Sequence, residues 1–221
     1  MNAPLIEVTQ LHKTYENGKI TVLRGADLSI QKGSIVALCG ASGCGKSTLL
    51  HMIAGIDTPD SGEVRVENER IDTEDKRTML LRNRIGFVFQ LHNLIPDLSL
   101  EENSMIPAIA AGVPTQKAQI RLDQLLERTG ISHRKKNRIQ DLSGGERQRT
   151  AICRALMNQP DIILADEPTG ALDEDSREQV FELLIDMVQS EGATLLIATH
   201  DKEIASRCDR VLQVSKGVVQ Q

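Results

Sequence analysis

The sequence predicts an α/β fold, in which a parallel sheet is flanked by helices and accompanied by an antiparallel β part at the N-terminus. Four short apolar runs are continuous rather than alternating, which is typical of parallel strands covered on both faces. Helical patterns separate these runs along the chain, as they do in α/β proteins. The runs are Ile35–Cys39, Ile85–Phe89, Ile162–Ala165 and Thr194–Thr199, and the helical patterns are Lys46–Ala54, Ser143–Met157 and Asp175–Ser190.

Shorter segments of alternating hydrophobicity precede the first apolar run. They cover Ile6–Val8, Ile20–Leu23 and Ala26–Ile30, and Asn17-Gly18 lies between the first two as a turn signal. We therefore expect antiparallel strands near the start of the chain.

A helical insertion interrupts the strand pattern between the second and third apolar runs. Its helices are predicted over Glu101–Ala111 and Gln116–Thr129, and Gly130 is a typical helix stop. We expect one domain over residues 1–221, with a core formed by 1–90 and about 155–221 and an inserted helical subdomain over about 91–154.

Polar residues follow each apolar run at the point where the predicted strand ends. Gln90 follows the second run, Asp166 and Glu167 follow the third, and His200 follows the fourth, while the first run leads into a glycine-rich loop. The carboxyl ends of parallel strands form the ligand-binding edge of open α/β sheets. The sequence therefore predicts that these groups gather at that edge.

The glycine-rich loop after the first run has the P-loop form, in which Gly-x-x-x-x-Gly-Lys-Ser leads into a helix. Its backbone N–H groups close around phosphates, Lys46 reaches the terminal phosphates, and the Ser47 hydroxyl binds magnesium. Kinases, GTPases and motor ATPases share this loop, so it predicts nucleotide binding but not the reaction. The predicted nucleotide-binding residues are Gly40, Ala41, Ser42, Gly43, Cys44, Gly45, Lys46, Ser47 and Thr48.

A second phosphate-binding loop is predicted far along the chain, at Leu142–Glu146. Ser143 followed by Gly144 and Gly145 at a helix start exposes unsatisfied backbone N–H groups and the positive end of the helix dipole. Two phosphate-binding loops in one chain require an explanation.

Two carboxylates at the end of the third run indicate the type of reaction. Asp166 fits a Walker B carboxylate that holds the magnesium ion already touched by Ser47. Glu167 can orient and polarise an attacking water, which a kinase would have to exclude. Hydrolysis is therefore favoured over phosphoryl transfer to another molecule.

Composition and charge exclude several classes of protein. The 221 residues carry a formal net charge of −5 and include one Tyr, three Phe and no Trp, which argues against nucleic acid as a partner. No apolar stretch approaches the roughly 18 to 20 residues needed to cross a bilayer, and there is no secretory signal, so we expect no lipid-spanning segment. The four cysteines have no paired C-x-x-C spacing, which argues against zinc or a disulfide framework.

Taken together, these motifs resemble those of an ABC-transporter nucleotide-binding subunit. The resemblance covers essentially the whole chain and rests on Gly40–Ser47, Gln90, Leu142–Glu146, Ala165–Asp173 and His200, which occur in the family's order. It implies a RecA-like P-loop NTPase core, transport-coupled ATPase activity, and ATP and Mg²⁺ as ligands.

The resemblance implies roles for individual residues. Tyr15 should stack on adenine, Gln90 should contact magnesium and water, and His200 should contact the γ-phosphate. Glu167 should be the catalytic carboxylate.

The resemblance also accounts for the two phosphate-binding loops. Ser143, Gly144 and Gly145 should grip the ATP held by the P-loop of a second copy, with Asp173 in the loop that crosses between the copies. The implied assembly is a homodimer of ATPase subunits that binds integral-membrane permease subunits. It would be peripheral, at the cytoplasmic face of the inner membrane.

Four segments, 57–62, 90–96, 142–149 and 165–170, are most similar to the lipoprotein-releasing and macrolide-exporter ATPases. The cell-division ATPase is a further relative of this group, and a small-molecule importer ATPase is an alternative. A soluble ABC ATPase of DNA repair or translation is disfavoured, because the chain has one ATPase unit, no heptad repeats and no zinc spacing. Coupling to the permease is expected through Leu91–Pro96 and the adjacent helical subdomain.

Overall fold

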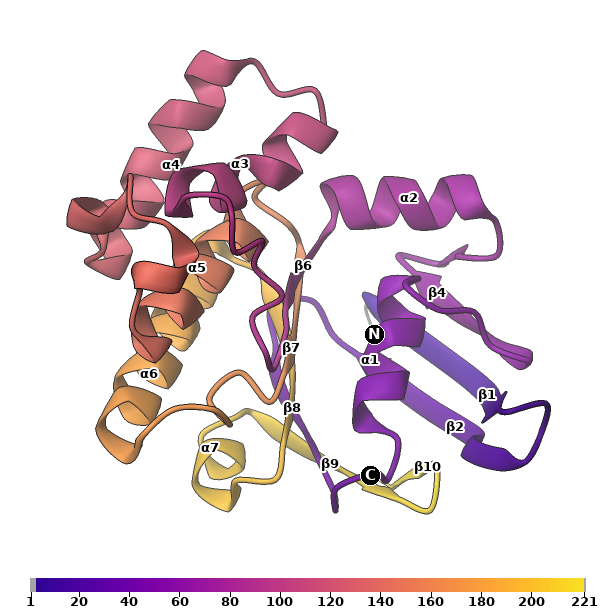
Figure 1. The fold of residues 1–221 in the computed structure, drawn as a ribbon. Coiled ribbons are helices and arrows are strands. Elements are labelled where there is room, and N and C mark those ends of the chain that lie inside the picture. Colours follow the sequence, from indigo (N-terminus) through magenta and orange to yellow (C-terminus); the bar gives the residue numbers. More distant parts are fainter. Residues whose placement is uncertain (1–2, 221) are drawn as a thin grey trace. The chain divides into compact units, whose positions relative to one another are not determined.

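The computed structural model describes residues 3–220, and the chain divides into two compact units. The first unit is Met1–Leu81 with Ala193–Gln221, and the second is Arg82–Gly192. Figure 1 shows the elements of both in sequence colours. The helical subdomain expected over about 91–154 lies within the second unit, which also contains strands.

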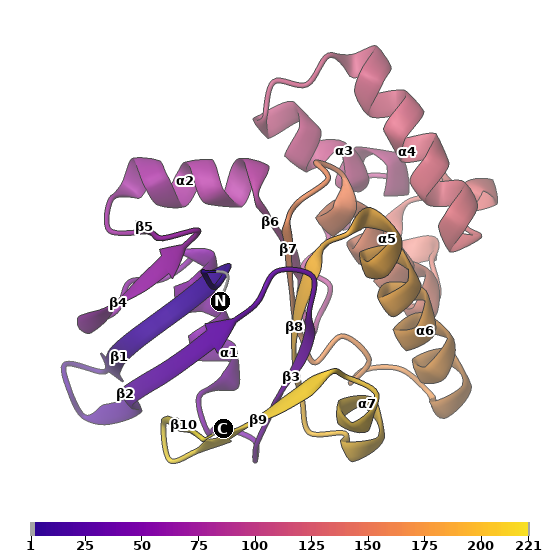
Figure 2. The same cartoon turned by 180° about the vertical axis from the view of Figure 1, so that it is seen from behind.

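An antiparallel sheet in the first unit confirms the β part expected near the N-terminus. Its strands are β1 (Ile6–Tyr15), β2 (Ile20–Ile30), β4 (Ser61–Val66) and β5 (Glu69–Arg70), in the order β2-β1-β4-β5 (Figure 2). The two segments expected between residues 20 and 30 form one continuous strand. Gly25 allows this because its φ of +80° absorbs a register shift that most side chains would resist.

Parallel strands form the rest of the sheet structure in the first unit. β3 (Ile35–Cys39) pairs in parallel with β8 (Thr194–Thr199) and β9 (Arg210–Ser215), and β10 (Val218–Gln220) returns antiparallel to β9. Every residue of β3 and β8 is buried, as their continuous apolar runs predict. Helices α1 (Lys46–Ala54) and α7 (Lys202–Ser206) pack against these strands. The elements β4, β5, α7, β9 and β10 were not predicted.

The second unit combines two parallel strands with four main helices. The strands β6 (Ile85–Val88) and β7 (Ile162–Asp166) pair in parallel, and both are buried. The helices are α3 (Leu100–Ala110), α4 (Thr115–Thr129), α5 (Gly144–Leu156) and α6 (Glu174–Glu191), with short 3₁₀ turns at Ser132–Arg134 and Ile139–Asp141 (Figure 1). These bounds agree with the predicted helices to within a residue or two.

Helix α2 (Glu74–Asn83) runs across the boundary between the two units and was not predicted. Leu80 is its one buried residue, so the segment lacks the apolar stripe by which an amphipathic helix is recognised. Its acidic first turn, Glu74 and Asp75, agrees with the helix dipole but is a weak signal by itself.

Helix α5 approaches β6 very closely within the second unit. A Cβ atom built on Gly86 would lie 2.1 Å from the carbonyl oxygen of Ala155, far inside any allowed contact. Glycine at this position therefore lets the helix that begins at the second glycine loop pack onto the strand that leads to Gln90.

Candidate functional site

The P-loop connects β3 to α1 in the first unit. Gly45, the N-cap residue of α1, has a φ of +108° and contributes no side-chain hydrogen bond, so the start of the helix is open to an anion. The buried Lys46 donates through Nζ to the carbonyl oxygen of Gly40 at 2.9 Å. A Cβ atom on Gly40 would lie 2.4 Å from the Val214 carbonyl oxygen and 2.6 Å from Cys44 Sγ, so only glycine fits there.

The structure brings His200 next to the P-loop. Cys39 and Thr199 are paired in the parallel ladder, so Gly40 and His200 leave neighbouring strands at the same edge. Both residues line a cavity of about 480 Å³ together with residues of α7 and β9. His200 is exposed and can reach a group held by the loop. This is the strand-end arrangement that the sequence predicted.

Tyr15 ends β1 in a small polar cluster that the sequence analysis did not foresee. Its hydroxyl donates to Asp57 Oδ2 at 2.9 Å, and Lys13 donates to Asp57 Oδ1 at 2.9 Å. Burial is the main cause that raises the pKa of Tyr15, and the hydrogen bond to Asp57 adds to it. Burial also acts to raise the pKa of Asp57, but hydrogen bonds from Lys13 and Thr58 outweigh it and lower that pKa. The ammonium group of Lys13 lies 5.0 Å from the centre of the Tyr15 ring. The cluster therefore holds the hydroxyl end of the ring that is expected to stack on adenine.

Asp166, Glu167 and Gln90 lie together in the second unit. Asp166 is the buried last residue of β7, and Glu167 follows with a φ of +45°, a left-handed conformation that is strained for a non-glycine residue. A Cβ atom on Gly170 would lie 3.4 Å from the Glu167 carbonyl oxygen and 3.8 Å from Gln90 Nε2. The amide of Gln90 therefore ends beside the turn that carries the two carboxylates.

The second glycine loop begins α5 with a capping box. Ser143 Oγ accepts from the N–H of Glu146 at 3.2 Å, and the Glu146 carboxylate accepts from the N–H of Ser143 at 2.8 Å. The capping box does not involve the N–H groups of Gly144 and Gly145, and these two groups have no acceptor within residues 3–220. Two free donors at a helix N-terminus suit a phosphate oxygen.

Asp173 is the N-cap residue of α6. Its Oδ1 accepts from the N–H of Ser176 at 2.9 Å, and this backbone bond holds the pKa of Asp173 below its ordinary value. Leu172, beside it, would lie 3.4 Å from a Cβ atom on Gly144. The structure therefore gives Asp173 a capping role and places its loop next to the second glycine loop.

Each unit by itself offers oxygen atoms of the kind that bind magnesium. The Ser47 hydroxyl belongs to the P-loop of the first unit, and Asp166 and Gln90 supply a carboxylate and an amide oxygen in the second. Mg²⁺ prefers such hard ligands and is typically bound by one or two carboxylates together with phosphates and water. Within residues 3–220 no cluster of three or more His, Cys, Asp or Glu side chains could hold a metal.

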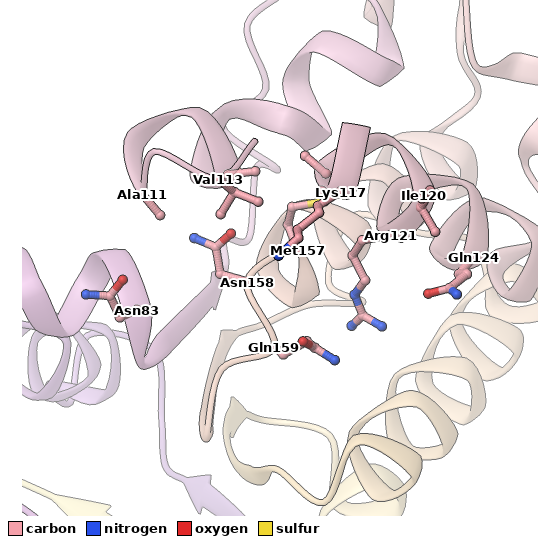
Figure 3. A pocket seen from close by; sticks show the side chains of 12 residues that line it. Asn83, Ala111, Val113, Lys117, Ile120, Arg121, Gln124, Met157, Asn158 and Gln159 are labelled. Carbon is pink, nitrogen blue, oxygen red and sulfur yellow. The ribbon is translucent and has the colours of Figure 1, made fainter. Parts of the chain in front are cut away.

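A further cavity, of about 460 Å³, lies among the helices of the second unit (Figure 3). Figure 3 shows Arg121 of α4 and Asn158, which follows α5, among the side chains that line it. Two buried polar atoms, Arg121 Nε and Asn158 Oδ1, have no hydrogen-bond partner among the described residues. These two residues were not among the predicted site residues, because no sequence motif marks them.

Comparison with known proteins identifies the family. Residues 23–170 match the family described as "ABC transporter". The chain belongs to this family. The match spans the P-loop, Gln90, the second glycine loop and the Walker B carboxylate of this ABC protein.

Two curated relatives of this ABC protein resemble it at similar levels of identity. The lipoprotein-releasing system ATP-binding protein LolD of Maricaulis maris is 46% identical over 217 residues, which cover 96% of this chain and 95% of the relative. The pyoverdine export ATP-binding/permease protein PvdT of Pseudomonas fluorescens is 47% identical over 225 residues, which cover 99% of this chain but 34% of the relative.

A solved structure confirms the fold of this ABC protein. The dimeric post-hydrolysis state of the ATP-binding cassette MJ0796, bound to ADP and phosphate, is similar with a TM-score of 0.89 and 36% sequence identity. The alignment covers 98% of this chain and 97% of that one. The α/β fold and the assignment as an ATP-binding ATPase, both expected from the sequence, are therefore confirmed.

Proposed function

We propose that this ABC ATPase drives a lipoprotein-releasing transporter. The observation that carries the proposal is the near-full-length similarity to LolD at 46% identity. Further LolD proteins, from Rhodospirillum rubrum and Paramagnetospirillum magneticum, match at 44% and 45% identity over almost the whole chain. PvdT, from the neighbouring group of exporters, matches at 47% identity over 99% of this chain.

The residues at the strand ends have distinct roles in the proposed hydrolysis. The P-loop N–H groups and Lys46 bind the β- and γ-phosphates of ATP. Glu167 orients and polarises the attacking water, Gln90 holds that water, and His200 donates to the γ-phosphate. The strained backbone at Glu167 supports a functional role, since such strain clusters at active sites.

Ser47, Asp166 and Gln90 are the proposed magnesium ligands. When bound, the ion neutralises negative charge that develops on the phosphate oxygens. The buried Asp166 at the end of β7 offers a carboxylate in a fixed position, which suits this task.

A second copy of the chain completes each proposed site. The unbonded N–H groups of Gly144 and Gly145 would bind the ATP held by the partner's P-loop, and Ser143 caps the helix that presents them. The similarity to the dimeric MJ0796 cassette supports this arrangement. Two ATP molecules would then join two copies head to tail.

A permease is the proposed partner at the membrane. No helix within residues 3–220 is long and apolar enough to span a bilayer. The relative PvdT is an ATP-binding/permease protein of which this chain matches about a third, so that protein contains both parts. Peripheral attachment to a separate permease, at the cytoplasmic face of the inner membrane, follows from the proposal.

The second unit offers exposed apolar side chains for that partner. Leu91 is 75% exposed and Ile109 is 69% exposed.

Copurification tests this proposal directly. The tagged chain, expressed together with permease subunits encoded in the same genome, should copurify with a permease in detergent. In proteoliposomes, ATP should then release an acylated protein from the membrane. Failure to copurify, or ATPase stimulation by nucleic acid or ribosomes, would contradict the transporter assignment.

An exporter of small molecules is the second candidate, because PvdT matches at 47% identity. The same proteoliposomes separate the two functions. ATP-driven movement of a siderophore or macrolide, without release of acylated protein, would favour the exporter.

A further inference from the structure

The turn that follows Gln90 has a strained backbone. His92 and Asn93 have φ angles of +63° and +48°, so two consecutive non-glycine residues adopt the left-handed conformation. The N–H of His92 donates to the Phe89 carbonyl at 3.1 Å, and that of Asn93 to the Leu91 carbonyl at 2.7 Å. Such a turn persists only where its surroundings hold it.

Arg154 of helix α5 holds this turn. One terminal nitrogen of its guanidinium donates to the Asn93 carbonyl and the other to the His92 carbonyl, each at 2.6 Å. The same group lies 5.9 Å from the centre of the Phe89 ring. The Arg154 side chain therefore contacts Phe89, which precedes Gln90, and also His92 and Asn93, which follow it.

The partners of Arg154 are unusual for a charged side chain. Within residues 3–220 Arg154 has no carboxylate partner. Burial is therefore not offset by a nearby negative charge, and it lowers the pKa of the guanidinium. Arg154 is half-buried, and a half-buried cation without a counter-charge is unfavourable unless its hydrogen bonds compensate. Its bonds go to the turn, so the position of the cation and the conformation of the turn depend on each other.

We propose that Arg154 is a positioning residue that fixes the turn after Gln90 to the helix that begins at Ser143. A shift of that helix would then move Gln90, and a displacement of the turn would move the second glycine loop. The inference rests on the proposed role of Gln90 as a ligand of magnesium and water.

Substitution of Arg154 tests the proposal in the full chain. Arg154→Met keeps the length of the side chain but removes its charge and donors, and Arg154→Lys keeps the charge with a single donor group. Arg149→Met is the matched control, since Arg149 lies on the same helix and donates to the Thr129 carbonyl at 2.8 Å instead.

Hydrogen exchange of the peptide 90–96 is the first readout. Arg154→Met should speed exchange of the His92 and Asn93 amides by about tenfold or more, because charge-assisted hydrogen bonds hold the turn closed. Arg154→Lys should restore part of the protection, and Arg149→Met should leave it unchanged. Unchanged exchange in Arg154→Met would overturn the proposal.

The magnesium dependence of ATP hydrolysis is the second readout. Arg154→Met should raise the half-maximal Mg²⁺ concentration several-fold, with nucleotide affinity in EDTA unchanged. Gln90→Ala is measured alongside and should itself shift the magnesium dependence. If it does, an Arg154→Met protein with faster exchange but unaltered magnesium dependence would overturn the proposal. If Gln90→Ala has no effect, the role of Gln90 is wrong, and the exchange result alone decides whether Arg154 holds the turn.

Discussion

Replacement of Glu167 by glutamine tests the hydrolytic site most directly. Glutamine has the same shape but cannot accept a proton from the attacking water. The turn should survive the change, because the N–H of Gly170 donates to the Glu167 backbone carbonyl at 3.0 Å and the neighbouring Thr169 is buried. The backbone strain at φ +45° is also the same for both side chains.

The expected loss of rate follows from the role assigned to Glu167. A positioned general base contributes about 10²- to 10⁴-fold, which corresponds to about 3 to 5 kcal/mol of barrier. ATP affinity should stay within about threefold, because the P-loop contacts are untouched. The variant should therefore bind ATP, hydrolyse it very slowly and accumulate as a dimer.

Phosphate release and size-exclusion chromatography with Mg²⁺ and ATP measure the two effects. Glu174→Gln is the matched control: this exposed residue lies in the first turn of α6, and its loss should leave both the rate and the elution volume unchanged. A Glu167→Gln protein that elutes as a monomer with ATP and hydrolyses it at the parent rate would refute the reasoning.

Three further substitutions test the nucleotide site, the packing and the permease surface. Lys46→Ala should weaken binding of a fluorescent ATP analogue at least tenfold, since Lys46 reaches the phosphates, and unaltered binding would contradict this. Gly86→Ala should lower the melting temperature by about 5 °C, because its Cβ atom meets the Ala155 carbonyl; an unchanged melting temperature would show that the helix can shift. Ile95→Asp should uncouple transport but spare basal hydrolysis. Ile20→Asp, at a position of similar exposure, is the control and should spare both activities. Equal loss of transport and hydrolysis in Ile95→Asp would count against docking at Ile95.

The elements that the sequence predicted well carry local signals. Four continuous apolar runs identified β3, β6, β7 and β8, because strands covered on both faces need apolar side chains at every position. Helix α5 was predicted from the helical pattern over Ser143–Met157 and from Ser143 with two glycines at its start, and in the structure the helix begins with a capping box. Helix α2 escaped prediction because it buries little more than Leu80.

The sequence by itself determined the chemical groups of the site and their order along the chain. The P-loop, the Walker B carboxylates and the second glycine loop are each formed by neighbouring residues, so spacing alone specifies their local geometry. It also predicted the family, because five such motifs occur in one order.

The tertiary structure alone decided which distant groups meet. The pairing of Cys39 with Thr199 brings His200 to the P-loop, and Gly170 lies beside Gln90 although 80 residues separate them along the chain. Arg154 reaches the turn after Gln90 because α5 packs tightly onto β6. These contacts depend on strand register and on helix packing, which arise from many weak long-range interactions and leave no local motif in the sequence.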